Sequence, residues 1–173
     1  MAHGSGDRPE RPPPPPSERS PHDNRRPRDQ QDHPPARADE KGDDAFNARD
    51  FATVDTVHHP DMIAYITGLA EPVYGKEAHA AAMQQFLRIF PDMHVYSDPY
   101  PVQFGSGDWI TVVTRATGTF TGEMTLPDGT VIPPTGKAFD LEFGQTSRWD
   151  GDRLIVISAF WDSALQARQL GLV

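Results

Sequence analysis

The chain has 173 residues with 18 prolines, no cysteine and a net charge of −9. Without cysteine it forms no disulfide and offers no thiolate metal site or thiol nucleophile. Residues 44–173 carry 8 basic and 16 acidic side chains, and this negative balance argues against nucleic acid and an anionic membrane surface as partners. No apolar run approaches the ~20 residues that span a bilayer and the N-terminus lacks the apolar core of a signal peptide, so the sequence predicts a cytoplasmic protein.

Residues 1–43 are predicted to form a disordered tail. They hold 10 of the 18 prolines, and beyond Met1 their only apolar residues are three alanines. Such a segment buries too little apolar surface to offset the entropy of ordering it. The run Pro12–Pro16 is interpreted as a flexible, partly polyproline II extension, with a ligand for a proline-binding groove as the alternative. The folded domain is therefore predicted to span residues 44–173.

The first half of this domain predicts two short helices broken at residues 48–50, a strand over Met62–Thr67, and a long helix. The long helix covers Lys76–Phe90 and ends before Pro91. His79, Met83, Phe86 and Phe90 are spaced four, three and four residues apart. This spacing is typical of the buried face of an amphipathic helix.

The second half predicts strands and a closing helix. Residues 137–149 alternate, with Phe139, Leu141 and Phe143 on one side and Asp140 and Glu142 on the other, so one face of that strand is predicted to be buried. The other predicted elements are a broken strand at 93–104, strands at 109–120 and 154–161, and a helix at 162–170. The fold class is therefore α+β. A strongly curved sheet can wrap the long helix and leave an apolar cavity between them.

Five short motifs follow one another along the domain. They are Phe46-Asn47-Ala48-Arg49-Asp50, Phe90-Pro91-Asp92, Gly118–Glu123, Pro133–Lys137, and Trp161-Asp162 followed by Gln169-Leu170-Gly171. In this order and spacing they resemble the motifs of the SnoaL-like polyketide cyclases, also called ester cyclases, in the nuclear transport factor 2-like superfamily.

The resemblance implies a cone-shaped, curved, mostly antiparallel sheet wrapped around helices as an α+β barrel with a deep apolar pocket. It also implies a homodimer formed through the sheet. The activity implied is an intramolecular aldol ring closure on an apolar polyketide-like molecule, without cofactor or metal. Related superfamily members isomerise, dehydrate or open epoxides.

The resemblance further implies that an aspartate near the end of the last strand is acid and base. The family pattern there is E-H-W-D-x-x-D, whereas this chain reads Val156–Asp162, so Asp162 alone matches. Asp162 is the predicted catalytic residue, since a carboxylate in an apolar pocket acquires a pKa near neutrality. The alternative is an N-cap for the helix that follows.

The predicted ligand pocket combines polar and apolar side chains. Gln145 continues the inward parity of the strand that holds Phe143 and is expected to be a neutral hydrogen-bonding group. His79 is either a ligand contact or a core histidine, and Tyr65 is either a donor to an enolate or a residue of the rim. The apolar wall is predicted to come from Met83, Phe86, Phe120 and Phe143.

His58-His59-Pro60-Asp61 has the residue types of a metal site, but adjacent histidines point in different directions and no further ligand has a recognisable spacing, so no metal is predicted. The sequence thus predicts a cofactor-free cyclase or isomerase. The alternatives are a non-catalytic binder of an apolar ligand and an epoxide-opening or dehydrating member of the same superfamily.

Overall fold

The structure is a computed structural model that describes residues 34–126 and 128–173. Of the tail predicted over residues 1–43, residues 1–33 lie outside the described residues. In chain order the elements are α2 (Pro34–Ala48), α3 (Phe51–Val57), β1 (His58–Ile66), β2 (Val73–Tyr74), α4 (Lys76–Ile89), β3 (His94–Val95), β4 (Val102–Ser106), β5 (Trp109–Thr119), β6 (Met124–Thr125), β7 (Val131–Ile132), β8 (Ala138–Asp150), β9 (Arg153–Trp161) and α5 (Ser163–Leu170).

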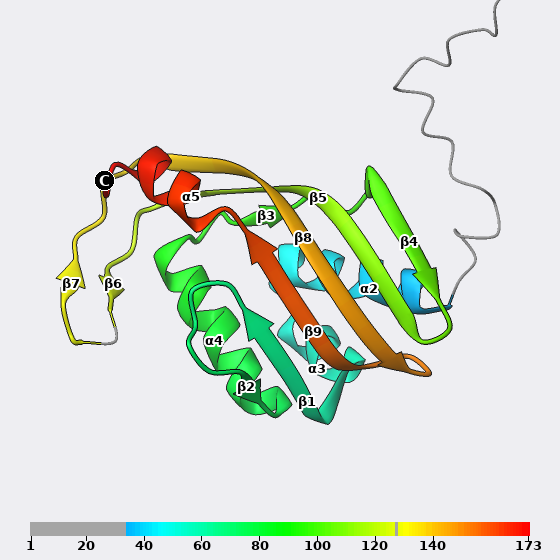
Figure 1. Ribbon diagram of the computed structural model, residues 1–173. Coiled ribbons are helices and arrows are strands. Elements are labelled where there is room, and N and C mark those ends of the chain that lie inside the picture. The colour runs from blue at the N-terminus through cyan, green and yellow to red at the C-terminus, as the bar shows by residue number, and fades with distance from the viewer. Residues whose placement is uncertain (1–33, 127) are drawn as a thin grey trace, which may run out of the picture.

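One curved sheet carries the fold, and α2, α3 and α4 lie against its inner face (Figure 1). Its strand order is β2-β1-β9-β8-β5-β3, and β4 also pairs with β5. The β1–β9 pair is parallel and the other pairs are antiparallel. The predicted α+β class with a cone-like, mostly antiparallel sheet around helices is confirmed, although the sheet does not close into a complete barrel.

The predicted alternation in β8 is confirmed. Phe139, Leu141, Phe143 and Gln145 are buried, whereas the residues between Phe139 and Phe143 that carry charge are exposed. A strand presents successive side chains to opposite faces, so this register turns the odd-numbered residues toward the helices. The pairing with β5 is continuous from Trp109↔Arg148 to Thr119↔Ala138 and holds that register in place.

The long helix α4 also follows the predicted face, with one difference. His79 is buried in its first turns and Phe90 is buried just beyond its end. Met83 and Phe86, expected to be fully buried, are only half-buried. The reason is that both line a cavity between α4 and the sheet instead of packing fully against it.

The predicted boundary at residue 44 is wrong for residues 34–43, because α2 begins at Pro34. Asp39 in this segment is only 4% exposed, and the carboxylate of Asp43 accepts a hydrogen bond from Tyr100 of the domain. The prediction took the polar composition of this segment as a sign of disorder. Its aspartates instead accept hydrogen bonds from polar side chains of the domain. The family resemblance at Phe46 therefore starts near the end of a helix.

The predicted break between the first two helices is confirmed and has a clear structural role. Arg49 takes a positive φ of 61° and its guanidinium donates to the carbonyl oxygens of Pro91 (2.6 Å) and Met93 (2.8 Å). Asn47 exchanges two hydrogen bonds with the backbone of Val95, at 2.7 and 2.9 Å. These contacts fasten the end of α2 to the segment that follows α4, and so fix where Asp39 and Asp43 lie.

Candidate functional site

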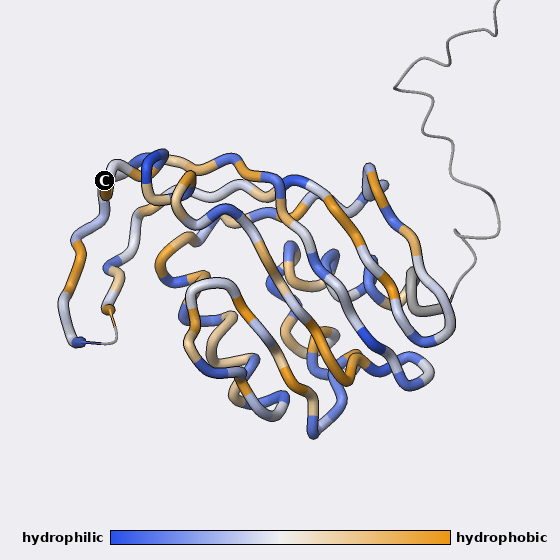
Figure 2. The backbone as a smooth tube through the Cα atoms, in the orientation of Figure 1, coloured by the Kyte–Doolittle hydropathy of each residue, from blue (hydrophilic) through white to orange (hydrophobic). Residues whose placement is uncertain are grey.

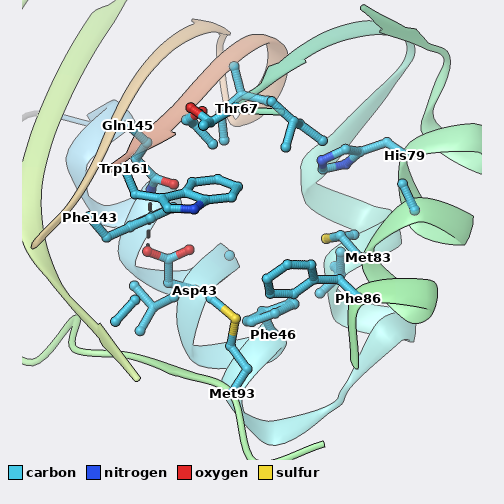
Figure 3. Close-up of a pocket in the computed structure, with 18 of the residues that line it drawn as sticks. Asp43, Phe46, Thr67, His79, Met83, Phe86, Met93, Phe143, Gln145 and Trp161 are labelled. Atoms are coloured by element: carbon cyan, nitrogen blue, oxygen red, sulfur yellow. Dashed lines mark hydrogen bonds between the residues drawn. The ribbon is translucent and has the colours of Figure 1, made fainter. Parts of the chain in front are cut away.

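A cavity of about 380 Å³ lies between the sheet and helices α2, α3 and α4 (Figure 3). This volume is within the range of pockets that hold small molecules, roughly 300–1,000 Å³. Its walls are mainly aromatic and aliphatic, and Phe46, Met83, Phe86, Met93, Phe143 and Trp161 are prominent among them. Its polar lining residues are Asp39, Asp43, His58, Thr67, His79, Gln85, Gln145 and Gln166.

Two carboxyl groups from α2 enter one side of this cavity. Asp39 and Asp43 are four residues apart and therefore lie on the same face of the helix. The side-chain amide of Gln145 donates to both, with Nε2 3.0 Å from Asp39 Oδ2 and 3.3 Å from Asp43 Oδ2. Gln145 thus connects the sheet to both carboxyl groups, and Figure 3 shows its contact with Asp43 as a dashed line.

Each carboxyl group has a further partner from the sheet side. The hydroxyl of Tyr100 donates to Asp43 Oδ2 at 2.6 Å. The hydroxyl of Ser147 donates to Asp39 Oδ1 at 3.0 Å, and Trp149 Nε1 donates to Ser147 Oγ at 2.9 Å. Both hydrogen bonds given to Asp43 end on Oδ2, so its Oδ1 is the oxygen left to interact with a ligand.

Burial raises the pKa of both carboxyl groups. The pKa of Asp43 rises from 3.8 to about 8, because of burial first and of repulsion from Asp39 second. Burial also raises the pKa of Asp39 from 3.8 to about 6, against the lowering effect of its bonds from Gln145 and Ser147. Asp43 is half-buried, but it lines the cavity, so its accessible surface faces a largely apolar space. Near neutral pH the pair therefore holds about one proton.

The imidazole ring of His79 lies on the opposite side of the cavity from Asp43 (Figure 3), and His58 lines the same cavity. His58 opens β1 and His79 belongs to α4, and their ring centroids are 4.9 Å apart in an edge-on arrangement. Burial lowers the pKa of each from 6.5 to about 4. For His79 the second cause is the neighbouring His58. Both rings are therefore neutral at pH 7.

Five of the side chains that the sequence assigned to the pocket come together on its wall. They are His79, Met83, Phe86, Phe143 and Gln145. They reach it from α4 and β8, which confirms the facing of these two elements. Whether they contact a ligand stays a prediction.

Two other predicted pocket residues lie elsewhere. Tyr65 is 48% exposed because its position in β1 faces outward, between the inward-facing Ala64 and the end of the strand. Phe120 is fully buried and packs on Phe90, with ring centroids 5.8 Å apart. It is part of the core behind the cavity wall and does not line the cavity itself.

Asp162, the predicted catalytic residue, is not among the residues that line the cavity. It is exposed, and its Oδ1 accepts a hydrogen bond from the backbone N–H of Leu165 at 2.8 Å. This is the N-cap of α5. The neighbouring Trp161 does line the cavity, and its Nε1 donates to Gln166 at 2.9 Å.

Sequence reasoning missed Asp39, Asp43 and Tyr100. The first two lay in a segment interpreted as tail, and Tyr100 lies between two prolines in the segment that was predicted only as a broken strand. The available signal was the spacing of Asp39 and Asp43, which places two acids on the side of a helix that also carries Phe46. The described residues contain no group of three or more His, Asp or Glu side chains placed to hold a metal ion. Within the same part of the chain, no helix is long and apolar enough to cross a membrane.

The stability of the protein is expected to fall between pH 6.5 and 8. A group whose folded pKa is raised binds a proton that the unfolded chain has released, so stability is lost as pH rises through the folded value. Below pH 6.5 the two effects oppose each other. The lowered pKa values of His58 and His79 make stability rise with pH, whereas the raised pKa of Asp39 makes it fall. Above pH 6.5 the raised pKa of Asp43, about 8, has the larger effect. The free energy of unfolding is expected to fall by about 1–2 kcal/mol between pH 6.5 and 8. Chemical denaturation at both pH values measures the loss. Asp43→Asn should remove it, whereas the exposed turn variant Asp152→Asn should retain it; equal slopes in both variants would contradict the assignment to Asp43.

Comparison with known proteins agrees with this fold. The sequence model of the SnoaL-like polyketide cyclases matches residues 36–170. A search of curated proteins gives no match.

Solved structures share the fold at low sequence identity. IdmH from Streptomyces antibioticus, assigned as a polyketide cyclase, superposes with a TM-score of 0.66 and 24% identity, over 80% of this chain and 99% of its own. A protein of Jannaschia sp. CCS1 assigned as a SnoaL-like polyketide cyclase has a TM-score of 0.70 and 18% identity, over 91% and 99% of the two chains. A Catenulispora acidiphila protein with a ketosteroid isomerase-like fold, solved with trimethylamine, has a TM-score of 0.62 and 13% identity, over 78% and 92%. At these identities the likeness concerns the fold alone.

Proposed function

We propose that this chain, which belongs to the SnoaL-like polyketide cyclase family, catalyses an acid–base reaction of cyclase or isomerase type. Its substrate in this proposal is an apolar, carbonyl-bearing, polyketide-like small molecule. The observation that carries this proposal is the carboxyl group of Asp43, with a raised pKa of about 8, in a cavity with mainly apolar walls. A general acid–base group is most effective when its pKa lies near the working pH.

In the proposed reaction Asp43 first acts as a base and then as an acid. Its carboxylate removes a proton from a carbon next to a substrate carbonyl. The resulting enolate carbon forms a bond to a second carbonyl carbon of the same molecule, and the alkoxide formed there takes the proton back from Asp43. Asp43 returns the proton that it removed, so the enzyme ends in its starting state and the product is an isomer of the substrate. No electrons leave or enter the substrate, so the closure needs no oxidant or reductant.

The neighbours of Asp43 have supporting roles in this proposal. Tyr100 stays protonated, because burial and the charge of Asp43 raise its pKa, and it donates to Oδ2 together with Gln145. These two donors hold the carboxyl group and leave Oδ1 toward the substrate. They also stabilise the charged form, which keeps the carboxyl group able to ionise near neutral pH.

Proton transfer can be tested without the natural substrate. 2-Tetralone is a neutral two-ring ketone with acidic protons next to its carbonyl. In D2O the protein is expected to exchange these protons for deuterium faster than buffer, with a rate that rises with pH through about 8 as Asp43 ionises. NMR of the ketone measures the exchange. A rate no higher than that with heat-unfolded protein would contradict the proposed activity.

The second candidate function is non-catalytic binding of an apolar ligand. The observation that favours it is the N-cap role of Asp162, since this is the residue that matches the aspartate of the family pattern. This function predicts saturable binding of 2-tetralone with no exchange of its protons beyond the buffer rate. The same NMR samples therefore separate the two candidates.

We also propose that the protein is a homodimer formed through the outer face of the sheet. Tyr65, Trp109 and Phe160 are 48%, 43% and 46% exposed at outward-facing positions of β1, β5 and β9. Gly144 lies beneath the ring of Phe160, and a Cβ at this position would come within 2.2 Å of the ring. The absence of a side chain at Gly144 therefore lets the ring pack on the backbone of the sheet. Exposed aromatic side chains on one face are typical of interfaces between protein chains.

Light scattering on the full chain is expected to give the mass of two chains. The double variant Tyr65→Glu/Phe160→Glu should give the mass of one chain, because it places charges inside the proposed interface. Tyr74→Glu, at a residue 65% exposed on the edge strand β2, is the matched control and should remain dimeric. A wild-type protein that is monomeric at micromolar concentration would contradict the proposal.

A further inference from the structure

Asp39 is a buried ionisable group beside the cavity that the proposed reaction does not use. It is 4% exposed and lies one helical turn before Asp43 on the same face of α2. Each of its two oxygens already accepts a hydrogen bond from β8, Oδ2 from Gln145 and Oδ1 from Ser147. Asp39 is therefore held against the sheet, and any effect that it has on a substrate passes through its neighbours.

The charge of Asp39 has no cation to offset it. In the described part of the chain its hydrogen-bond donors are a neutral amide and a neutral hydroxyl, and the ion pairs found there involve neither Asp39 nor Asp43. The other ionisable groups that act on the two carboxyl groups are themselves acidic, and they are Glu40 and Asp44 on α2 and Tyr100 between β3 and β4.

A buried carboxylate without a counter-charge is costly to the fold. Buried charges in proteins are normally paired with an opposite charge, and ionisable groups kept in unfavourable surroundings cluster at functional sites. An uncharged asparagine has the same shape as the side chain of Asp39. Packing alone therefore does not account for an aspartate at this position.

One amide group links Asp39 to Asp43. Gln145 Nε2 lies 3.0 Å from Asp39 Oδ2 and 3.3 Å from Asp43 Oδ2, and an amide nitrogen has two hydrogens to donate. Ser147 holds Asp39 from the other side and accepts a hydrogen bond from Trp149. The position of the amide depends on Asp39, and so does one of the two hydrogen bonds that orient Asp43.

We propose that Asp39 is a positioning residue that makes Asp43 a stronger base. It keeps the Gln145 amide turned toward Asp43, and its own charge lies close to Asp43 without a cation beside it. The inference rests on the proposed function for the step in which Asp43 removes a proton from the substrate. Asp39 itself does not touch the substrate.

The effect of this charge has a definite sign. Two like charges in one site disfavour each other, so a negative Asp39 holds the proton on Asp43 up to a higher pH. This repulsion is the second cause of the raised pKa of Asp43, after burial. A carboxylate that binds its proton more strongly is also the better base once it is ionised. Without the charge, Asp43 ionises at a lower pH and removes protons more slowly.

Asp39→Asn tests the inference, because it removes the charge and keeps the shape. The rate of deuterium exchange on 2-tetralone is measured between about pH 5 and 10. In the variant the midpoint of the rise in rate is expected to fall by roughly one pH unit or more, and the plateau at high pH to fall several-fold. A residue that only supports the fold would lower the rate at every pH and leave the midpoint in place.

Asp44→Asn is the matched control. It removes one negative charge from the same helix at the residue next to Asp43, but Asp44 is exposed and its partner is Ser97 instead of Gln145. Solvent and salt screen an exposed charge, so the midpoint should move by no more than roughly a few tenths of a pH unit. A shift as large as that of Asp39→Asn would overturn the role given to Asp39, because any acid on α2 would then have the same effect.

An NMR titration gives the same information without a substrate. In the full, unmodified chain the carboxyl carbons of Asp39 and Asp43 are expected to respond to each other's ionisation, so each signal should shift in two steps. In Asp39→Asn the signal of Asp43 should shift in one step at lower pH. If this variant fails to fold, the titration of the unmodified chain decides alone.

Each outcome decides the inference. Single, independent steps for the two carbons, or an Asp43 midpoint that Asp39→Asn leaves unchanged, would overturn it. A lowered Asp43 midpoint in the variant, together with no exchange of 2-tetralone by the wild-type protein, would leave the effect of Asp39 standing and reject the proposed function. Exchange by the wild-type protein with an unchanged midpoint in the variant would do the reverse.

Discussion

Asp43→Asn is expected to lower the rate of deuterium exchange on 2-tetralone by roughly 10²–10⁴, the usual contribution of a positioned general acid or base. Asparagine keeps the shape of the side chain and an oxygen that can accept from Tyr100 and Gln145, as Asp43 Oδ2 does. It cannot take a proton at neutral pH. The variant should therefore remain folded and lose the chemistry.

Asp162→Asn is the matched control for this experiment. Asparagine caps helices about as well as aspartate, and Asp162 contacts the backbone of Leu165 outside the cavity. Its exchange rate should equal that of the wild type. An unchanged rate in Asp43→Asn together with a large loss in Asp162→Asn would contradict the assignment and return the catalytic role to the residue that matches the family pattern.

Deletion of residues 1–43 is expected to destabilise the domain by several kcal/mol. The deletion removes the first ten residues of α2 and with them the buried Asp39 and the carboxyl group of Asp43. Gln145 and Ser147 then lose their partners inside the protein. A buried group left without its partner costs about 1–3 kcal/mol, and the loss of part of the cavity wall exposes apolar surface in addition.

The control for this deletion removes residues 1–33 and leaves α2 whole. On composition alone it should change the melting temperature little, because the removed segment has almost no apolar residues. The longer deletion should lower the melting temperature by more than about 10 °C in a domain of this size. Equal melting temperatures for the two deletions would show that residues 34–43 contribute nothing to the fold, against the burial of Asp39.

The elements that the sequence predicted well are those with a regular apolar pattern. In β8 the alternation of Phe139, Leu141 and Phe143 with charged residues leaves one register, since a shift by one residue would bury the charges. This register also predicted correctly that Gln145 turns toward the helices. In α4 the spacing of His79, Met83 and Phe86 similarly identified the side that meets the cavity.

The carboxyl groups of the site escaped prediction because their environment is created by the tertiary structure. Asp39 and Asp43 are polar residues in a polar segment, and nothing in their local sequence shows that Gln145 and Tyr100 approach them from more than 55 residues away. Hydropathy assigns such residues to solvent. The two aspartates become buried, with raised pKa values, only because α2 packs against the sheet.

Asp162 shows the converse difficulty. A family pattern identifies a position, but a carboxylate that precedes a helix satisfies a capping role equally well. In this chain the side chain turns to the backbone of Leu165, and the cavity receives the neighbouring Trp161 instead. The acid–base role proposed here therefore moves from the end of the sheet to α2.

The measurement that tests this account most directly is an NMR titration of the side-chain carboxyl carbon of Asp43 in the full chain. The account predicts a pKa of about 8, because burial and the nearby Asp39 both disfavour the charged form. A value near 4, as for a solvated aspartate, would show that Asp43 is fully ionised and well hydrated at neutral pH, and would contradict its role as the acid–base group of the cavity.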